Sequence, residues 1–280
     1  MSIVNKILLT LMLLCGNLNL FAQTPLQAQY DFAMQLFTES KYFDSITEFK
    51  RLSFFDNKKI YNYMANLQIG RAYKEGGKFD EAVKYFTLAE MNSSNKQEYF
   101  ESKIWAIRAN ILRRSTDLAL KILDQLESNS KFDSSKEEIN YWEGWAYIFA
   151  DKWDLAAESF SKNPADSSLA KFCNDVDDEK FSESFAKYSS YLIPGLGQFY
   201  TGEYISGVLS LGWNVLFGYL TINSFAEERV FDGIVTANFL WLRFYSGNLQ
   251  NAEKFVKQKN LTISNEALKY LQSEYQGKKP

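Results

Sequence analysis

The residue types that most often carry catalysis or bind metal ions are scarce in this 280-residue chain. It contains no histidine, the most common general base and the most common metal ligand. Of its two cysteines, Cys15 lies in a segment that we expect to be removed, and a lone Cys173 supports neither a disulfide framework nor a zinc site. We expect Cys173 to be a small, semi-buried apolar side chain, and we predict no cofactor and no metal site.

Acidic pairs do occur, but their spacing does not suit acid–base catalysis. Glu137 directly precedes Glu138, and Glu227 directly precedes Glu228, so the two members of a pair do not share a helix face. A net charge of −3 also lacks the basic surplus that phosphate neutralisation requires. We therefore expect neither an enzyme with a small-molecule substrate nor a nucleic-acid-binding protein.

A glycine cluster near residue 195 could suggest a phosphate-binding loop. No strand is expected before it and no Lys-Ser or Lys-Thr follows, so we reject that interpretation. The cluster resembles the Pro-Gly-x-Gly-Gln-x-Tyr-x-Gly signature of the two-transmembrane-helix domain family. The matching residues are Pro194, Gly195, Gly197, Gln198, Tyr200 and Gly202. The resemblance implies that a hydrophobic helical hairpin follows the motif.

The segment after the motif has the composition of such a hairpin, which we place at residues 182–258. Residues 204–226 carry no charged side chain and would form a helix of about 34 Å, which exceeds a bilayer core of about 30 Å. The second apolar stretch, 230–242, carries Asp232 and would span only by extending through Arg243 to Tyr245. The aromatic side chains expected in an interfacial belt are Tyr188, Tyr191, Phe199, Tyr200 and Tyr204.

Small and polar residues recur every four positions in the hairpin, a spacing that lets membrane helices pack backbone to backbone. Asn214 is placed to form a hydrogen bond across the pair. The predicted packing residues are Ser206, Ser210, Asn214 and Gly218, opposite Gly233 and Ala237. The alternative is that the same helices form the buried core of a soluble protein.

The N-terminus has the features of an export signal. Lys6 precedes the apolar run 7–14, which is too short to span a bilayer, and Ala22 is a suitable small residue before a cleavage site. Lipid modification at Cys15 is the rival, but Leu14 is larger than the residue that normally precedes a lipidated cysteine. We favour a signal peptide over residues 1–22 and a mature chain that begins at Gln23.

Residues 26–162 contain repeated helix-pair patterns. The clearest unit runs from Tyr63 to Ser94, and a second good copy lies near residues 144–160. Both resemble the tetratricopeptide repeat, in which small residues mark the closest approach of two helices and rings fill the space beside them. The packing residues that this resemblance implies are Gly70, Tyr73, Ala82, Phe86, Gly144, Tyr147, Ala156 and Phe160.

The other copies are weaker. Ala33 and Phe37 begin a set that precedes the clear unit by 36 residues, close to the family period of about 34, and residues 105–126 form a degenerate pair. Stacked pairs would line a groove with their first helices. Side chains expected there, or else in the core between repeats, are Tyr61, Tyr63, Asn66, Tyr141 and Trp142.

The remaining segments are polar. We expect residues 163–181 to form a linker or capping helix, and residues 259–280 a polar tail with a short helix capped by Ser264. The sequence thus predicts an all-α protein, a tetratricopeptide-like solenoid followed by a hydrophobic hairpin. The expected function is a non-enzymatic scaffold of the cell envelope whose repeats bind an unidentified protein or peptide. The hairpin would contact membrane lipid and tether the exported protein to the inner membrane, with the repeats in the periplasm. The alternative is a soluble periplasmic interaction protein.

Overall fold

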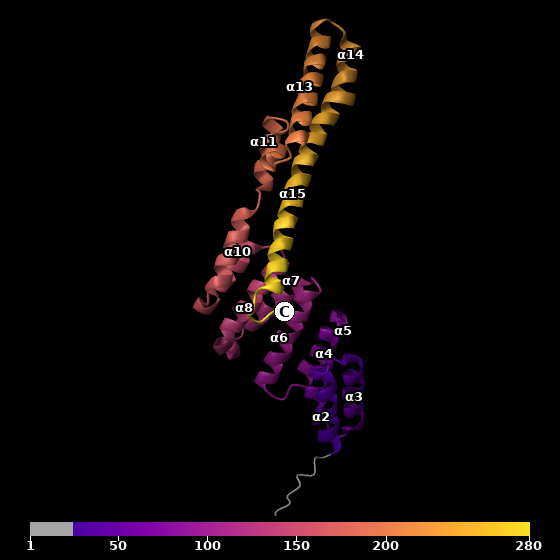
Figure 1. Cartoon of the computed structure of the whole chain (residues 1–280), viewed down its shortest axis with the longest axis vertical. Helices are drawn as coiled ribbons and strands as arrows, with labels where there is room; N and C mark the ends of the chain where they lie inside the picture. The colour runs from indigo at the N-terminus through magenta and orange to yellow at the C-terminus, as the bar shows by residue number, and fades with distance from the viewer. Residues whose placement is uncertain (1–24) are drawn as a thin grey trace, which may run out of the picture. The chain divides into compact units, whose positions relative to one another are not determined.

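The computed structural model describes residues 25–280, so the predicted signal peptide lies outside the described residues. Throughout residues 25–280 the regular structure is helical, with no β-strand, and successive helices pack in pairs (Figure 1). The predicted all-α fold is confirmed. The chain divides into two compact units, residues 25–134 and residues 135–279.

The first unit is a series of consecutive helix pairs. Each pair consists of two helices of 12 to 17 residues joined by a tight turn. The pairs are α2 (Pro25–Thr38) with α3 (Tyr42–Phe55), α4 (Asn62–Glu75) with α5 (Phe79–Met91), and α6 (Lys96–Leu112) with α7 (Thr116–Glu127). A 3₁₀ segment, η1 (Ser130–Ser135), follows α7.

The turn inside each pair is the same and recurs every 37 residues. The turn residue has a positive φ in every case: Ser40, Gly77, Arg114 and, in the second unit, Asp151. The next amide then donates to a carbonyl five residues back, as Lys78 does to Tyr73 at 2.8 Å and Lys152 to Tyr147 at 3.0 Å. The spacing of 36 predicted for the first pair is therefore wrong by one residue.

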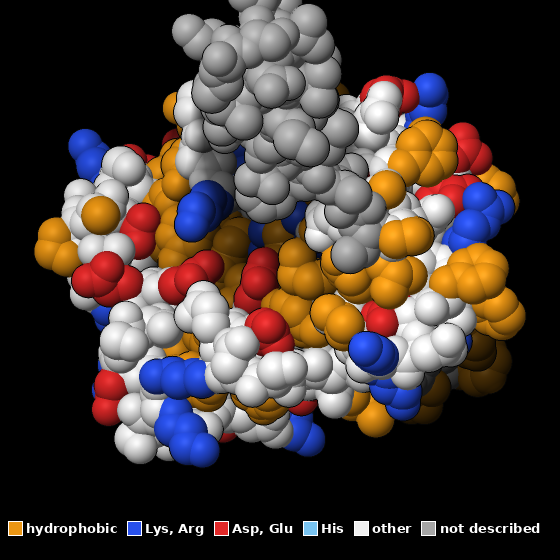
Figure 2. Space-filling model, turned by 90° about the horizontal axis from the view of Figure 1, so that it is seen from below, with side chains coloured by type: hydrophobic (Ala, Val, Ile, Leu, Met, Phe, Trp, Pro, Cys, Tyr) orange, Lys and Arg blue, Asp and Glu red, His pale blue; other side chains and the backbone are white. Residues whose placement is uncertain are grey.

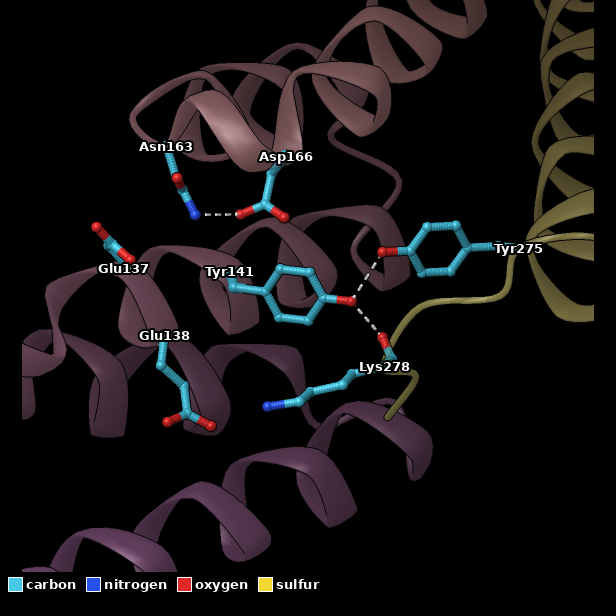
Figure 3. A pocket seen from close by; sticks show the side chains of 7 residues that line it. All are labelled: Glu137, Glu138, Tyr141, Asn163, Asp166, Tyr275 and Lys278. Carbon is cyan, nitrogen blue, oxygen red and sulfur yellow. Dashed lines mark hydrogen bonds between the residues drawn. The ribbon is translucent and has the colours of Figure 1, made fainter.

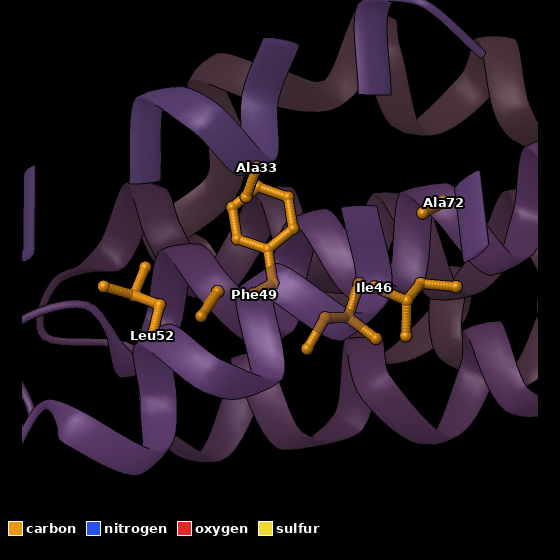
Figure 4. Close-up of a cluster of buried hydrophobic side chains, with 7 residues drawn as sticks. Ala33, Ile46, Phe49, Leu52 and Ala72 are labelled. Carbon is orange, nitrogen blue, oxygen red and sulfur yellow. The ribbon is translucent and has the colours of Figure 1, made fainter. Parts of the chain in front are cut away.

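The same period governs the core of the pairs. In each pair, a residue of the first helix and the residue sixteen positions later in the second helix are both buried. These positions hold Ala33 with Phe49, Gly70 with Phe86, Ile107 with Leu123, and Gly144 with Phe160. Figure 4 shows the cluster of the first pair, in which Phe49 lies beside Ala33. Burial of these apolar faces between neighbours supplies most of the stability of such pairs.

The second unit begins with one further pair and continues into the hairpin. Its elements are α8 (Lys136–Phe149), α9 (Trp153–Ser161), η2 (Pro164–Asp166), α10 (Ser167–Glu179), α11 (Glu183–Leu192), α12 (Leu196–Tyr200), α13 (Tyr204–Ala226), α14 (Val230–Val235), the π-helical η3 (Thr236–Trp241) and α15 (Leu242–Ser273). Residues 163–181, predicted as a linker or capping helix, are mostly helical: η2 begins at Pro164 and α10 packs on α9.

The helix that returns from the hairpin is longer than the sequence predicted. Segments α14, η3 and α15 follow one another without a break and run beside α13 (Figure 1). Ser264 does not cap a separate helix, because it lies buried within the C-terminal half of α15. The short tail helix predicted after residue 259 is thus part of α15, and the tail begins after Ser273.

Candidate membrane hairpin and helix-pair surface

The predicted repeat-packing residues lie where two helices approach most closely. A Cβ added to Gly70 would lie 2.6 Å from the ring of Phe86, and one added to Gly144 would lie 2.6 Å from the ring of Phe160. Ala82 and Ala156 are fully buried on the second helices. Tyr73 and Tyr147 are half-buried at the ends of the first helices, where Tyr73 stacks on Tyr85 at 5.4 Å.

The residues predicted for a partner groove have different environments. Tyr63 is 6% exposed and Trp142 is 1% exposed, so both belong to the core between helices and not to an open groove. Tyr61 is half-buried and donates to Gln27 at 2.8 Å, while Asn66 donates to a carbonyl of its own helix. Tyr141 lines a pocket of the second unit.

A basic cluster lies on the first helices of the first unit. The guanidinium of Arg71 lies 5.2 Å from the centre of Phe37 and 5.0 Å from that of Trp105, and Arg108 stacks on Trp105 at 4.0 Å. Burial lowers the pKa of the nearby Lys74, and the charges of Arg108 and Arg71 lower it further, although Glu75 opposes them. The cluster brings three cationic side chains together on this face, of which Lys74 is buried and pairs with Glu75 at 3.4 Å. The sequence analysis did not identify this cluster.

The hairpin motif is a compact turn in which the glycines have separate roles. Pro194 follows the end of α11, and Gly195 adopts a φ of +95°, which favours glycine. A Cβ on Gly197 would lie 2.6 Å from the carbonyl of Ala186 and 2.7 Å from Ala252, so only glycine fits between α11 and α15. Gly202, at φ +79°, ends α12 in the same left-handed conformation.

One amide side chain of α15, Asn248, holds this motif in place. Its Oδ1 accepts from the Gly195 amide at 2.7 Å, from Ser210 at 2.9 Å and from Gln198 at 3.1 Å. Its Nδ2 donates to the Ser190 carbonyl at 3.0 Å. Asn248 is buried, and it thereby connects α11, the motif, α13 and α15. Tyr200 adds a further link, because its hydroxyl accepts from the Ser182 amide at 3.0 Å.

Helix α13 has the reverse of the side-chain distribution found in water-soluble helices. It is 23 residues long, and only 22% of its most apolar 18-residue stretch is buried. Its buried residues are small or polar: Gly207, Asn214, Gly218, Thr221 and Ser224. Its exposed residues are large and apolar, among them Ile205, Val208, Leu209, Val215, Leu216, Tyr219 and Ile222. This exposed surface is continuous over the length of the helix.

The small residues of the hairpin pack differently from the prediction. Gly218 faces Trp241, whose ring lies 3.3 Å from an added Cβ, and Gly233 faces the ring of Phe225 at 2.8 Å. Rings therefore fill the space beside the glycines, which excludes direct backbone-to-backbone packing at these positions. Asn214 donates within its own helix, to the Ser210 carbonyl at 2.8 Å, so the predicted cross-helix bond comes instead from Ser210 to Asn248. Ser206 and Ala237 are half-buried.

A pocket of about 330 Å³ lies on α8 of the second unit (Figure 3). The side chains around it are mostly acidic or aromatic: Glu137, Glu138, Tyr141, Asn163, Asp166, Tyr275 and Lys278. Burial and the charge of Glu137 raise the pKa of Asp166, while a hydrogen bond from Asn163 opposes the rise. The pocket adjoins the C-terminal segment of the chain.

The described residues contain no group of three or more histidine, cysteine or carboxylate side chains arranged to hold a metal ion. Cys173 is fully buried in α10, and burial raises the pKa of its thiol to about 12. On the face drawn in Figure 2, basic and acidic side chains are interspersed with apolar ones. Comparison of the chain with models of known protein families and with curated proteins finds no match.

Proposed function

We propose that the protein is a non-enzymatic scaffold of the cell envelope whose helix pairs bind a protein or peptide and whose hairpin tethers it to a membrane. The inverted distribution of side chains on α13 carries this proposal. Burying small and polar residues while exposing large apolar ones is unfavourable in water and favourable in lipid. A helix of 23 residues is about 34 Å long and can cross a bilayer core.

The contacts at the base of the hairpin support the proposal that the tether is firmly joined to the fourth helix pair. The Asn248 contacts fasten the motif to α15, and the C-terminal half of α15 packs against α10. There Ser264 donates to Asp151 at 2.6 Å, and Tyr270 stacks on Phe172 at 5.2 Å. A single helix thus belongs both to the hairpin and to the packing around the fourth helix pair.

The proposed partner is supported by the repeat resemblance and the basic cluster, and the proposed location in the cell by the predicted signal peptide. The resemblance to tetratricopeptide repeats makes protein or peptide binding the expected role of the pairs. Arg71, Lys74 and Arg108 would favour an acidic segment on the first unit. With a signal peptide over residues 1–22, the helix pairs would lie in the periplasm and the hairpin in the inner membrane.

The second candidate is a soluble periplasmic protein that uses the apolar hairpin to bind a partner. It is favoured by the return segment, because Asp232 lies near its start and only α13 among the described helices is long and apolar enough to cross a membrane. An exposed apolar patch of this size marks either a membrane or a protein interface.

Membrane extraction distinguishes the two candidates. Membranes from the native host are washed with alkaline carbonate, and the pellet and the supernatant are probed for the protein. We expect the protein to stay in the pellet and to require detergent for release. Release by carbonate as a protein that remains soluble without detergent would refute the tether and support the second candidate.

A further inference from the structure

The C-terminal tail, residues 274–279, folds back onto the first helix of the fourth pair. The hydroxyl of Tyr275 lies 3.1 Å from that of Tyr141, and the Tyr141 hydroxyl donates to the main-chain carbonyl of Lys278 (Figure 3). The ring of Tyr275 also packs against Trp145, with centroids 5.9 Å apart. The tail therefore contacts α8 through both side chains and backbone.

The contacted position on α8 corresponds to the basic cluster on the earlier pairs. With the period of 37 residues, Trp145 is equivalent to Arg108 and Arg71. Those two arginines lie on the face formed by the first helices of the first unit. The tail thus covers a face of the fourth pair. On the earlier pairs, the equivalent face is the one around Trp105.

The charges of the pocket and the tail are complementary. Glu137, Glu138 and Asp166 line the pocket, and the tail contributes Lys278 to the same lining, with its side chain extending on the same side as Glu138 (Figure 3). Lys279 bonds to the Gln272 carbonyl at 2.7 Å, close to the end of α15. A basic segment is the ligand that such an acidic pocket favours.

We propose that the α8 face around Tyr141 and Trp145 is a docking site for a peptide with a tyrosine followed three residues later by a lysine, and that the chain's own tail is its resident occupant. The tyrosine ring packs on Trp145, its hydroxyl bonds to Tyr141, and the lysine lies at the rim of the acidic pocket. The Tyr141 bond to a main-chain carbonyl holds the peptide backbone. This inference rests on the partner-binding role proposed above and adds a basic segment, bound by the fourth pair, to the acidic segment proposed for the first unit; it does not depend on the membrane tether.

The test measures binding of a labelled peptide with the sequence of residues 273–279 to the purified full chain in detergent micelles, by fluorescence anisotropy. In the parent chain the tail competes with the labelled peptide for the α8 site, so we expect the peptide to bind weakly. The Tyr275→Ala change removes the ring and hydroxyl of the tail and should raise peptide affinity at least tenfold. Lys278→Glu in the chain should act in the same direction, because it places a fourth carboxylate at the pocket.

Matched variants distinguish the loss of specific docking contacts from a general effect of mutating the tail. Gln276→Ala is the control, because its side chain bonds only to the Glu274 carbonyl within the tail, and it should bind peptide as the parent does. Adding Tyr141→Phe to Tyr275→Ala keeps the ring but removes the hydroxyl, and it should reverse most of the gain. A peptide with lysine 278 replaced by glutamate should fail to bind.

The proposal is overturned if neither tail variant, each shown by circular dichroism to retain its helices, binds the peptide more tightly than the parent. It is also overturned if the glutamate peptide binds as well as the parent peptide. The membrane assay is unaffected by either result, so failure of the docking site and failure of the tether are distinguishable.

Discussion

At the scale of single residues, the glycines that face phenylalanine rings should be the least tolerant positions of the helix pairs. Gly70→Ala or Gly144→Ala places a methyl group 2.6 Å from a buried ring, so the ring must move within a packed core. We expect each change to lower the free energy of unfolding by about 1–3 kcal/mol, the usual cost of overpacking. Thermal or denaturant unfolding in detergent micelles measures the change.

Gly247→Ala provides the matched control. It lies in α15 with open space around the added methyl, so the higher helix propensity of alanine should make it neutral or stabilising by up to about 1 kcal/mol. Combining Gly70→Ala with Phe86→Leu should recover part of the loss, because the smaller side chain gives the methyl room. If Gly70→Ala and Gly247→Ala melt alike, the close approach at Gly70 is wrong.

Sequence patterns identify some of these residues and not others. Gly70 with Phe86 is recognisable because a small residue and a ring at this spacing match the repeat resemblance. Asn248 is not, because it lies in a polar helical segment and nothing in the local pattern separates it from Asn251. Its importance arises from donors of α12, α13 and the motif, which only the folded chain brings together.

At the scale of elements, the helix pairs were predictable, but their exact register was not. The turn residue is glycine only at Gly77, whereas Asp151 is of a type that tolerates positive φ, and Ser40 and Arg114 adopt it without being typical of it. An alignment based on apolar residues alone therefore slipped by one position. Likewise, Ser264 matches a helix cap in sequence, but it lies within the C-terminal half of α15 and its hydroxyl donates to Asp151.

The packing of the hairpin predicts opposite outcomes for two glycines of the same helix. Gly218→Leu would drive a side chain into Trp241 and should separate α13 from the return segment, with loss of stability. Gly212→Leu enters open space on the exposed face and should be tolerated, as should Leu220→Ile. Limited proteolysis of the chain in detergent micelles reports the loosening. Equal protease sensitivity of both glycine variants would contradict the packing assigned here.

The junction between α15 and the fourth helix pair should weaken in acid. Burial raises the pKa of Asp151, but hydrogen bonds from Lys180, Ser264 and Trp153 outweigh it and hold that pKa below its usual value. A carboxyl with a lowered pKa stabilises the fold above its ordinary pKa of about 3.9, and the contribution is lost as the pH falls through the folded value. Asp151→Asn, which keeps a residue that tolerates positive φ, should melt below the parent near pH 7.

Melting curves of the parent and Asp151→Asn between pH 3 and 7 test this prediction. The gap between their melting temperatures should begin to narrow below pH about 4, where Asp151 of the unfolded parent takes up a proton. It should close as the pH falls through the lowered pKa of the folded state, because both folded chains then carry an uncharged side chain at this position. Asp177 contributes differently in the two proteins, because the charge of Asp151 helps to raise its pKa. Carboxyl groups away from Asp151 act on both proteins equally and cancel in the comparison. A gap that is independent of pH would show that the charge of Asp151 does not stabilise the junction.

At the scale of the whole molecule, the proposed function predicts how the hairpin is oriented in the membrane, and this orientation can be tested directly. An exported chain would have both ends of the hairpin in the periplasm and the turn between α13 and α14 in the cytoplasm. That turn contains one basic residue, Arg229, which pairs with Glu227 at 2.8 Å, while Lys254, Lys257 and Lys259 lie beyond the other end. The positive-inside rule therefore does not favour this orientation, but a leading signal peptide usually decides it.

A single cysteine at the turn tests the orientation. Glu228→Cys is made in a chain that lacks Cys173, and cells with a permeable outer membrane are treated with a membrane-impermeant thiol reagent. We expect no labelling until the inner membrane is lysed, because the turn would face the cytoplasm. Asn129→Cys, exposed in the loop after α7, is the positive control and should react in intact cells. Labelling at position 228 in intact cells would place the turn in the periplasm and reverse the proposed orientation, while protection at both positions would argue against export of the helix pairs.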